Sequence, residues 1–115
     1  MKDFMLLFRG GDGRKLDSPE EVQAHMQKWM VWIKDLNEKG HQAGGHPLLD
    51  NGKTISGTKN IVSDGPFTEG KEIVGGYLLI KADSLEQATE LSKGCPTLDF
   101  EDGIVEIRPI QNNGM

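Results

Sequence analysis

Two helix-start signals constrain the fold of this chain more than any other feature of its sequence. Ser18 is followed by Pro19 and, three residues on, by Glu21, a pattern typical of a helix N-terminus closed by a capping box. Ser84 and Gln87 repeat the same spacing later in the chain. The sequence therefore predicts two helices, one in each half of the chain.

Each predicted helix ends at a glycine and carries an apolar stripe. The first should end near residue 38, before Gly40, and the second at Gly94, where Pro96 prevents continuation. The residues of the stripes recur at helical spacing. They are Val22, Met26, Trp29, Ile33 and Leu36 in the first helix, and Leu85, Ala88 and Leu91 in the second.

Strand-like segments surround the two helices. Residues 2–9 are apolar at both alternating sets of positions, which predicts a strand covered on both faces. Residues 72–82 are the strongest candidate for a central strand, and residues 103–110 close the chain as another. Before the central strand, Asn51–Gly52 predicts the two-residue turn of a hairpin, which residues 60–64 either extend or follow as a further edge.

The resulting order is strand, helix, hairpin, strand, helix, strand. This order predicts an α+β fold of ferredoxin-like type, an antiparallel sheet with both helices on one face, in a single domain over residues 1–115 with a frayed tail at about 111–115. The other face of the sheet would carry Phe4, Leu6 and Phe8, or their neighbours. Because an uncovered apolar sheet face usually marks an interface, we expect a homodimer packed sheet to sheet.

Composition excludes several classes of partner. The net charge of −5 argues against nucleic acid and against an anionic membrane surface, and no apolar run is long enough to span a bilayer. The lone Cys95 cannot form an internal disulfide, which suits the cytoplasm. His41, His46 and Asp50 match no zinc-binding spacing, so we expect neither a metal nor a cofactor.

The first helix contains the most interesting titratable residue. On a helical projection His25 lies beside Trp29 and on the same edge as Trp32, at the boundary between core and solvent. One interpretation is a histidine that only packs and hydrogen-bonds there. The other is a titratable group at the mouth of a pocket lined by tryptophans.

Glu106 and Arg108 lie two apart on the last predicted strand, so their side chains share a face. They could form an ion pair on an edge strand or a bridge across a dimer. Alternatively, Arg108 could bind a carboxylate in bidentate fashion.

The loop at residues 63–72 also has two interpretations. Pro66 fixes a bend and Phe67 can anchor it in the core, while Asp64 can accept hydrogen bonds from turn amides. A loop made rigid in this way would equally support a carboxylate that faces a cleft, with Lys71 available to bind an anionic group.

The motifs of this region resemble the DGPF branch of the YCII-related family. The matching elements, in order, are "DGPF" at 64–67, "KE" at 71–72, "GGY" at 75–77, "CP" at 95–96 and "E-x-R-P" at 106–109. The resemblance implies a ferredoxin-like fold that forms a dimeric α+β barrel. It also implies acid–base chemistry in some members, which include a dehydrochlorinase of a chlorinated hydroquinone and others proposed to use a His–Asp pair. Asp64 lies on the family motif, whereas His25 matches only by its position in the first helix.

Two functional hypotheses follow. The first is a cofactor-free enzyme of lyase or isomerase type on a small cyclic or aromatic substrate, with His25 and Asp64 as catalytic groups. Its substrate-binding residues would be Trp29, Trp32, Phe67, Lys71 and Arg108. The alternative is a non-catalytic dimeric module that binds a small molecule or a protein, in line with the sigma-factor association of some family members.

Overall fold

The computed structural model describes residues 1–11, 16–65 and 73–111 of the chain. Its helices are α1 (Pro19–Glu38) and α2 (Leu85–Ser92), with a short 3₁₀ helix, η2 (Pro96–Asp99). Its strands are β1 (Lys2–Arg9), β2 (Gly44–Pro47), β3 (Lys53–Ser56), β4 (Ile61–Asp64), β5 (Val74–Ala82) and β6 (Ile104–Pro109).

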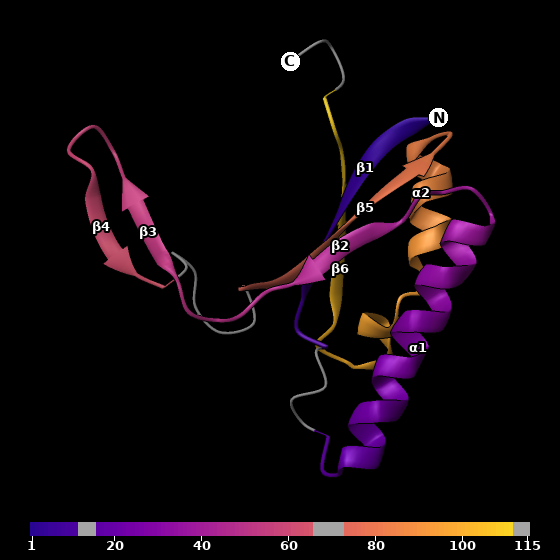
Figure 1. Cartoon of the computed structure of the whole chain (residues 1–115). Coiled ribbons are helices and arrows are strands. Elements are labelled where there is room, and N and C mark those ends of the chain that lie inside the picture. Colours follow the sequence, from indigo (N-terminus) through magenta and orange to yellow (C-terminus); the bar gives the residue numbers. More distant parts are fainter. Residues whose placement is uncertain (12–15, 66–72, 112–115) are drawn as a thin grey trace.

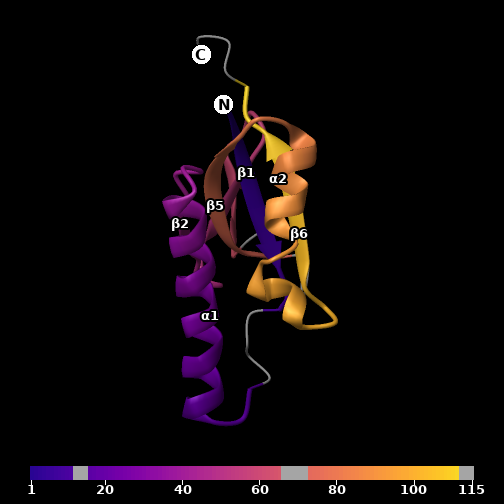
Figure 2. The same cartoon turned by 90° about the vertical axis from the view of Figure 1, so that its right-hand side faces the viewer.

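Four strands form the main sheet, in the order β2-β5-β1-β6, and every neighbouring pair is antiparallel. Both helices cover the same face of this sheet (Figure 1), and the view turned by 90° shows them side by side in front of it (Figure 2). This confirms the predicted α+β fold with ferredoxin-like strand order. The strands β3 and β4 form a separate two-stranded sheet inserted between β2 and β5.

The capping signals act as the sequence predicts. Ser18 Oγ accepts a hydrogen bond from the backbone N–H of Glu21 at 3.1 Å, and Ser84 Oγ accepts one from Gln87 N–H at 3.1 Å. Gly40 follows α1 with a φ of +87°, a conformation that glycine adopts without strain. The predicted bounds of α1 are therefore confirmed at both ends.

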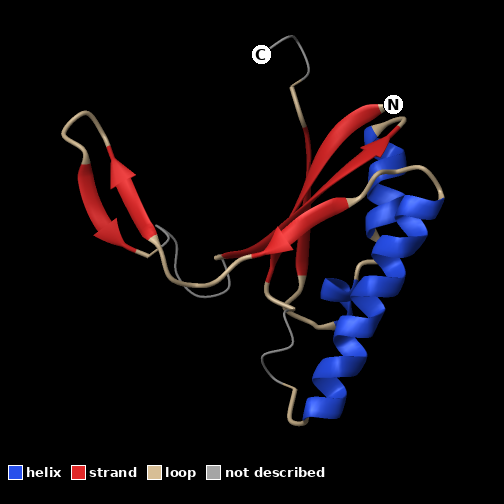
Figure 3. Cartoon of the chain, viewed as in Figure 1, coloured by secondary structure: helices blue, strands red, loops and turns tan. Residues whose placement is uncertain are grey.

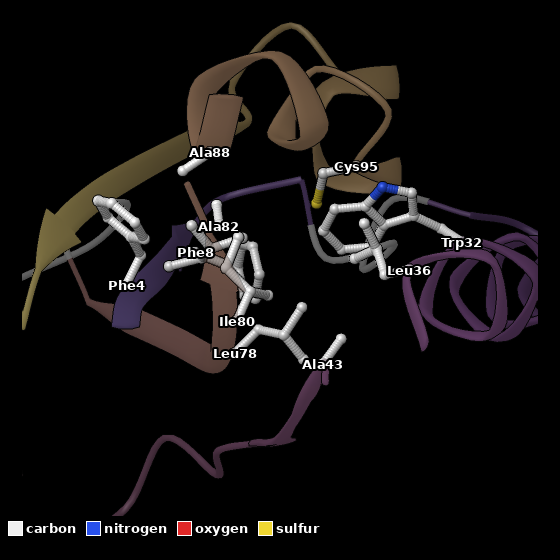
Figure 4. Close-up of a cluster of buried hydrophobic side chains, with 11 residues drawn as sticks. Phe4, Phe8, Trp32, Leu36, Ala43, Leu78, Ile80, Ala82, Ala88 and Cys95 are labelled. Atoms are coloured by element: carbon white, nitrogen blue, oxygen red, sulfur yellow. The ribbon is translucent and has the colours of Figure 1, made fainter. Parts of the chain in front are cut away.

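The core lies between the main sheet and the helices (Figure 4). Phe4, Leu6 and Phe8 of β1 point into it, opposite the helix-facing residues of β5. The indole N–H of Trp32 donates to the carbonyl oxygen of Leu91 at 3.2 Å, which ties α1 to α2. The full buried cluster comprises Phe4, Leu6, Phe8, Trp32, Leu36, Ala43, Leu78, Ile80, Ala82, Ala88 and Cys95.

The stripe predicted for α1 is wrong in its first two turns. Val22 is 41% and Met26 60% exposed, whereas His25 is half-buried and Trp32 belongs to the core. The physical reason is visible in Figure 1, where α1 begins beyond the ends of the strands, so its first turns have no sheet beneath them. Leu85 of α2 is likewise 44% exposed, although Ala88 is buried.

The predicted Asn51–Gly52 hairpin is also wrong. β2 pairs with β5, and β3 pairs with β4, so Asn51–Gly52 lies on the link between the two sheets. The hairpin turn is at residues 57–60, where Asn60 N–H donates to the Gly57 carbonyl oxygen at 3.2 Å. Gly57 and Asn60 both have positive φ, a requirement that these two residue types meet more easily than others.

The second face of the main sheet is apolar at its centre. Met5 lies opposite Leu79, and Leu7 opposite Tyr77, on the side away from the helices. We call this surface the open face. It confirms that the neighbours of Phe4, Leu6 and Phe8 make the far side of the sheet apolar. In the single chain Leu79 is 41% exposed.

Candidate functional site

His25 lies on the inner edge of α1, where its ring is half-buried among aromatic side chains. The indole Nε1–H of Trp29, one helical turn later, donates a hydrogen bond to Nε2 of His25 at 3.2 Å. The imidazole also meets the ring of Phe100 edge-on, with centroids 5.1 Å apart and planes at 74°. The helical phase thus places His25 where the sequence predicts it, next to Trp29.

This hydrogen bond fixes the tautomer of neutral His25. Because Nε2 accepts a hydrogen bond from the indole N–H, the ring's own proton is on Nδ1. Among the residues that the structure describes, none hydrogen-bonds to Nδ1. The ring can therefore donate from Nδ1 to a ligand oxygen without giving up its contact to Trp29.

Trp29 and Trp32 have different roles in this cluster. Trp29 packs edge-on against Phe8 of the sheet, with centroids 5.0 Å apart, and stays partly exposed on its other side. It also meets Trp32 at 5.7 Å. Trp32 is only 9% exposed and belongs to the core, so it supports Trp29 from behind rather than offering a surface to a ligand.

Two charged residues accompany the aromatic cluster. Lys28, on the turn of α1 after His25, donates to Oδ2 of Asp99 at 3.2 Å. Both side chains are exposed, so the pair contributes little to stability, but it joins α1 to the residue that precedes Phe100. We call the group His25, Lys28, Trp29, Asp99 and Phe100 the α1–η2 seam.

Tight backbone packing holds the η2 side of the seam in place. A side chain on Gly103 would place its Cβ 1.9 Å from the carbonyl oxygen of Thr97, and one on Gly11 would come within 2.3 Å of the same oxygen. Thr97 itself is 1% exposed. These contacts fix the backbone on both sides of Phe100.

Sequence reasoning missed Lys28, Asp99 and Phe100. Phe100 meets His25, and Asp99 meets Lys28, only because η2 packs against α1, a contact between segments some seventy residues apart. The only hint of this contact in the sequence is "CP" at 95–96. It marks the end of a helix, but it does not indicate which part of the chain the following residues contact.

The structure does not bring Asp64 to His25 within one chain. Asp64 ends β4 on the two-stranded hairpin, which stands apart from the helices on the far side of the main sheet (Figure 1). Its carboxylate forms an ion pair with Lys53 of β3, directly opposite in register, and is 88% exposed. A shallow hollow at the base of the hairpin is lined by Asn51, Gly52, Lys53, Asp64 and Gly65.

Arg108 lies on a third surface, the open face. It is opposite Met5 in the sheet register, and its NH1 is 3.5 Å from Oε2 of Glu106. Glu106 in turn receives a hydrogen bond from NH1 of Arg9 at 2.6 Å. The Arg108 side chain is 68% exposed, so one cation of this group is available to a ligand or a partner. The sheet separates it from His25.

Phe67 and Lys71 lie outside the described residues, as does Pro66. Of the sequence-predicted site, the structure therefore brings together His25, Trp29 and Trp32, and places Asp64 and Arg108 on two other surfaces.

The remaining cysteine and histidine residues near the core have structural surroundings. Burial raises the pKa of the Cys95 thiol to about 11, which leaves it a protonated thiol and a poor nucleophile at neutral pH. His41 is buried, with Nδ1 2.9 Å from the Lys81 carbonyl oxygen. In the part of the chain that the structure describes, no three His, Cys, Asp or Glu side chains gather closely enough to bind a metal ion.

The fold and the seam define an α+β protein of ferredoxin-like order with a half-buried histidine at an aromatic seam. Residues 4–112 match the model of the YCII-related domain. The chain belongs to the YCII-related family, as the DGPF-type motifs of its sequence predicted.

Two individual proteins resemble the chain more distantly. An uncharacterized protein of Rhizobium meliloti (strain 1021) is 36% identical over 55 residues, which is 48% of this chain and 44% of that protein. The match thus spans less than half of that relative's length. The 5-chloro-2-hydroxyhydroquinone dehydrochlorinase TftG from Burkholderia phenoliruptrix AC1100, in complex with 2,5-dihydroxybenzoquinone, is 20% identical, with a TM-score of 0.41 over 96% of this chain and 95% of that one. Similarity at this level supports no conclusion about substrate.

No helix among the described residues is both long enough and apolar enough to cross a membrane.

Proposed function

We propose that the chain is a cofactor-free acid–base enzyme of lyase or isomerase type, acting on a small cyclic or aromatic substrate at the α1–η2 seam. The observation that carries the proposal is the hydrogen bond from Trp29 to Nε2 of His25, which leaves Nδ1–H as a donor at the partly exposed edge of an aromatic cluster. Membership of the YCII-related family is consistent with this chemistry.

In this proposal His25 stabilises negative charge on a substrate oxygen. Removal of a proton from a carbon beside a carbonyl group places negative charge on the carbonyl oxygen, and a donor already in position lowers the barrier to the step. Asp99 is the carboxylate that the chain itself supplies at the seam, and it would accept the carbon-bound proton. Lys28 would then bind an anionic group of the substrate, while Trp29 and Phe100 contact its ring.

Isotope exchange tests the chemistry directly. A suitable probe is 4-oxocyclohexanecarboxylate, which combines a ring carbonyl with an anionic group. In D₂O the native protein should accelerate deuterium uptake beside the carbonyl at least tenfold over buffer, as followed by proton NMR. His25→Gln should lose this acceleration.

His46→Gln provides the matched control, because His46 is an exposed imidazole on β2, away from the seam. It should keep the exchange rate of the native protein. Equal rates for the native protein, the His25 variant and buffer would contradict the enzyme proposal. Binding of 4-hydroxybenzoate at Trp29 in NMR spectra, without exchange of the ketone probe, would favour the non-catalytic binding module instead.

We also propose that two copies pair through the open face and that the protein works in the cytoplasm. The apolar centre of the open face, made by Met5, Leu7, Tyr77 and Leu79, supports the pairing, because such a surface is costly to leave in water. The free, buried Cys95 is compatible with a reducing compartment. Light scattering at micromolar concentration should give twice the chain mass, and a monomer there would refute the pairing.

A further inference from the structure

The hairpin of β3 and β4 stands apart from the other helices and strands that the structure describes. Its strands pair only with each other, and it stands on the side of the main sheet opposite the helices, as Figures 1 and 3 show. Seven of its eight strand residues are exposed, and only Thr54 is half-buried. Among the described residues, nothing therefore buries either face of this two-stranded sheet.

One face of the hairpin is suited to burial. Ile55 lies directly opposite Val62, so their side chains share a face, and they are 67% and 58% exposed. The ion pair of Lys53 and Asp64 continues the same face toward the base of the hairpin. The opposite face carries a single large apolar residue, Ile61.

The base of the hairpin is firmly connected, although the faces are bare. Gly65 N–H donates to the Gly52 carbonyl oxygen at 2.6 Å, and Thr54 Oγ1 donates to the Gly65 carbonyl oxygen at 2.7 Å. An isolated two-stranded hairpin is marginally stable at best in water, because it lacks a packed apolar face. A hairpin with so regular a register thus implies a surface that packs against it.

We propose that this surface belongs to a second copy of the chain: the hairpin is an arm that packs its Ile55–Val62 face against the open face of the partner. The arm and the open face lie on the same side of the molecule, so a two-fold axis between two copies can place each arm on the other copy. The Ile55–Val62 face and the open face then both become buried in one closed dimer.

The charged residues also favour a second copy of the chain as the partner of the arm. The Ile55–Val62 face of the arm ends in the ion pair of Lys53 and Asp64, and the open face carries Glu106 with Arg9 and Arg108. Both surfaces therefore offer charges of both signs, which can pair across the contact. On the arm, Asp64 can meet an exposed cation of the partner's open face, and Arg108, whose side chain is 68% exposed, is the candidate.

This inference rests on the proposed pairing of two copies and not on chemistry at His25. Sedimentation equilibrium of the full chain tests it without any ligand. Ile55→Thr combined with Val62→Thr should raise the dimer dissociation constant at least tenfold, because it removes the apolar contact of the arm. Ile61→Thr, a similar change on the opposite face of the same hairpin, should leave the constant unchanged.

A contact measurement separates the arm from other arrangements. In a dimer mixed from isotope-labelled and unlabelled chains, filtered NOE spectra should connect methyl groups of Val62 with those of Met5 or Leu79 of the other copy. The same NOEs found only within one copy would show that the arm folds back on its own sheet, and would overturn the proposal. An unchanged dimer dissociation constant in the Ile55→Thr, Val62→Thr double variant would also overturn it. That result would not contradict the pairing of two copies or the exchange chemistry.

Discussion

The indole of Trp29 donates to Nε2 of His25 across 3.2 Å, one helical turn apart on α1. This relationship predicts a single neutral tautomer of His25, with the proton on Nδ1. Nitrogen-15 spectra of the neutral imidazole should show Nδ1 as the protonated nitrogen and Nε2 as the bare one.

Trp29→Phe tests the cause of this preference. The variant keeps an aromatic ring beside His25 but removes the N–H donor, so the two nitrogens should give averaged shifts typical of mixed tautomers. A single Nδ1–H tautomer that persists in the variant would mean that another group fixes the ring. The Trp29 hydrogen bond would then not be its determinant.

Leu36 and Met26 should respond oppositely to truncation, although both belong to the apolar stripe predicted from the sequence. Leu36 is 1% exposed and Met26 60% exposed. Leu36→Ala should lower the free energy of unfolding by about 3 kcal/mol, from lost burial and the cavity left behind. Met26→Ala should change it by less than about 0.5 kcal/mol. Denaturant melts that give equal losses would place the start of α1 against the sheet.

That contrast shows how far sequence reasoning reaches in this chain. Caps, helix ends and strand order are local or periodic features, so the ferredoxin-like fold could be read from Ser18, Gly40, Ser84 and the apolar runs. The burial of each residue in α1 could not be predicted in this way, because it depends on where α1 begins relative to the strands. Periodicity predicts which residues share one face of a helix, but not where along the sheet the helix begins.

The same limit explains the outcome for the candidate site. His25 and Trp29 are four residues apart, so their contact follows from helical geometry. Phe100 reaches His25, and Asp99 reaches Lys28, through tertiary packing of η2, which no short motif records. Asp64 was joined to His25 by family resemblance, and its distance from α1 depends on a hairpin that leaves the main sheet. An Asn-Gly turn signal predicts a local hairpin, and it cannot show that β2 pairs with β5 and β3 with β4.

Cys95 should make the stability of the chain depend on alkaline pH. Burial raises its pKa from 9.0, the ordinary value of a thiol, to about 11. Between these values the unfolded state releases the proton and the folded state retains it. The thiol contribution therefore falls as pH rises through this window, by on the order of 2–3 kcal/mol at its upper end.

The comparison with Cys95→Ala isolates this contribution from lysine and tyrosine titrations. The difference in unfolding free energy between native and variant chains should be constant below about pH 8 and should shrink above about pH 9. A difference that stays flat to pH 11 would mean that the folded protein exposes the thiol. Slow reaction of the native thiol with a disulfide reagent at neutral pH would support the same burial independently.

Gly103 should be among the least replaceable residues near the seam. A Cβ at this position would lie 1.9 Å from the Thr97 carbonyl oxygen, and the obstacle is backbone, which no rotamer change can remove. We expect Gly103→Ala to lower the free energy of unfolding by about 1–3 kcal/mol, because η2 must shift to relieve the contact. Gly52→Ala is the matched control, since a Cβ there meets nothing within 4 Å, and it should cost about 0.5 kcal/mol or less.

The displacement of η2 should also move Phe100, so the ring protons of His25 should shift in NMR spectra of Gly103→Ala and not in those of Gly52→Ala. Unchanged His25 signals in a destabilised Gly103 variant would show that η2 does not position Phe100, and the seam would then consist of α1 residues alone.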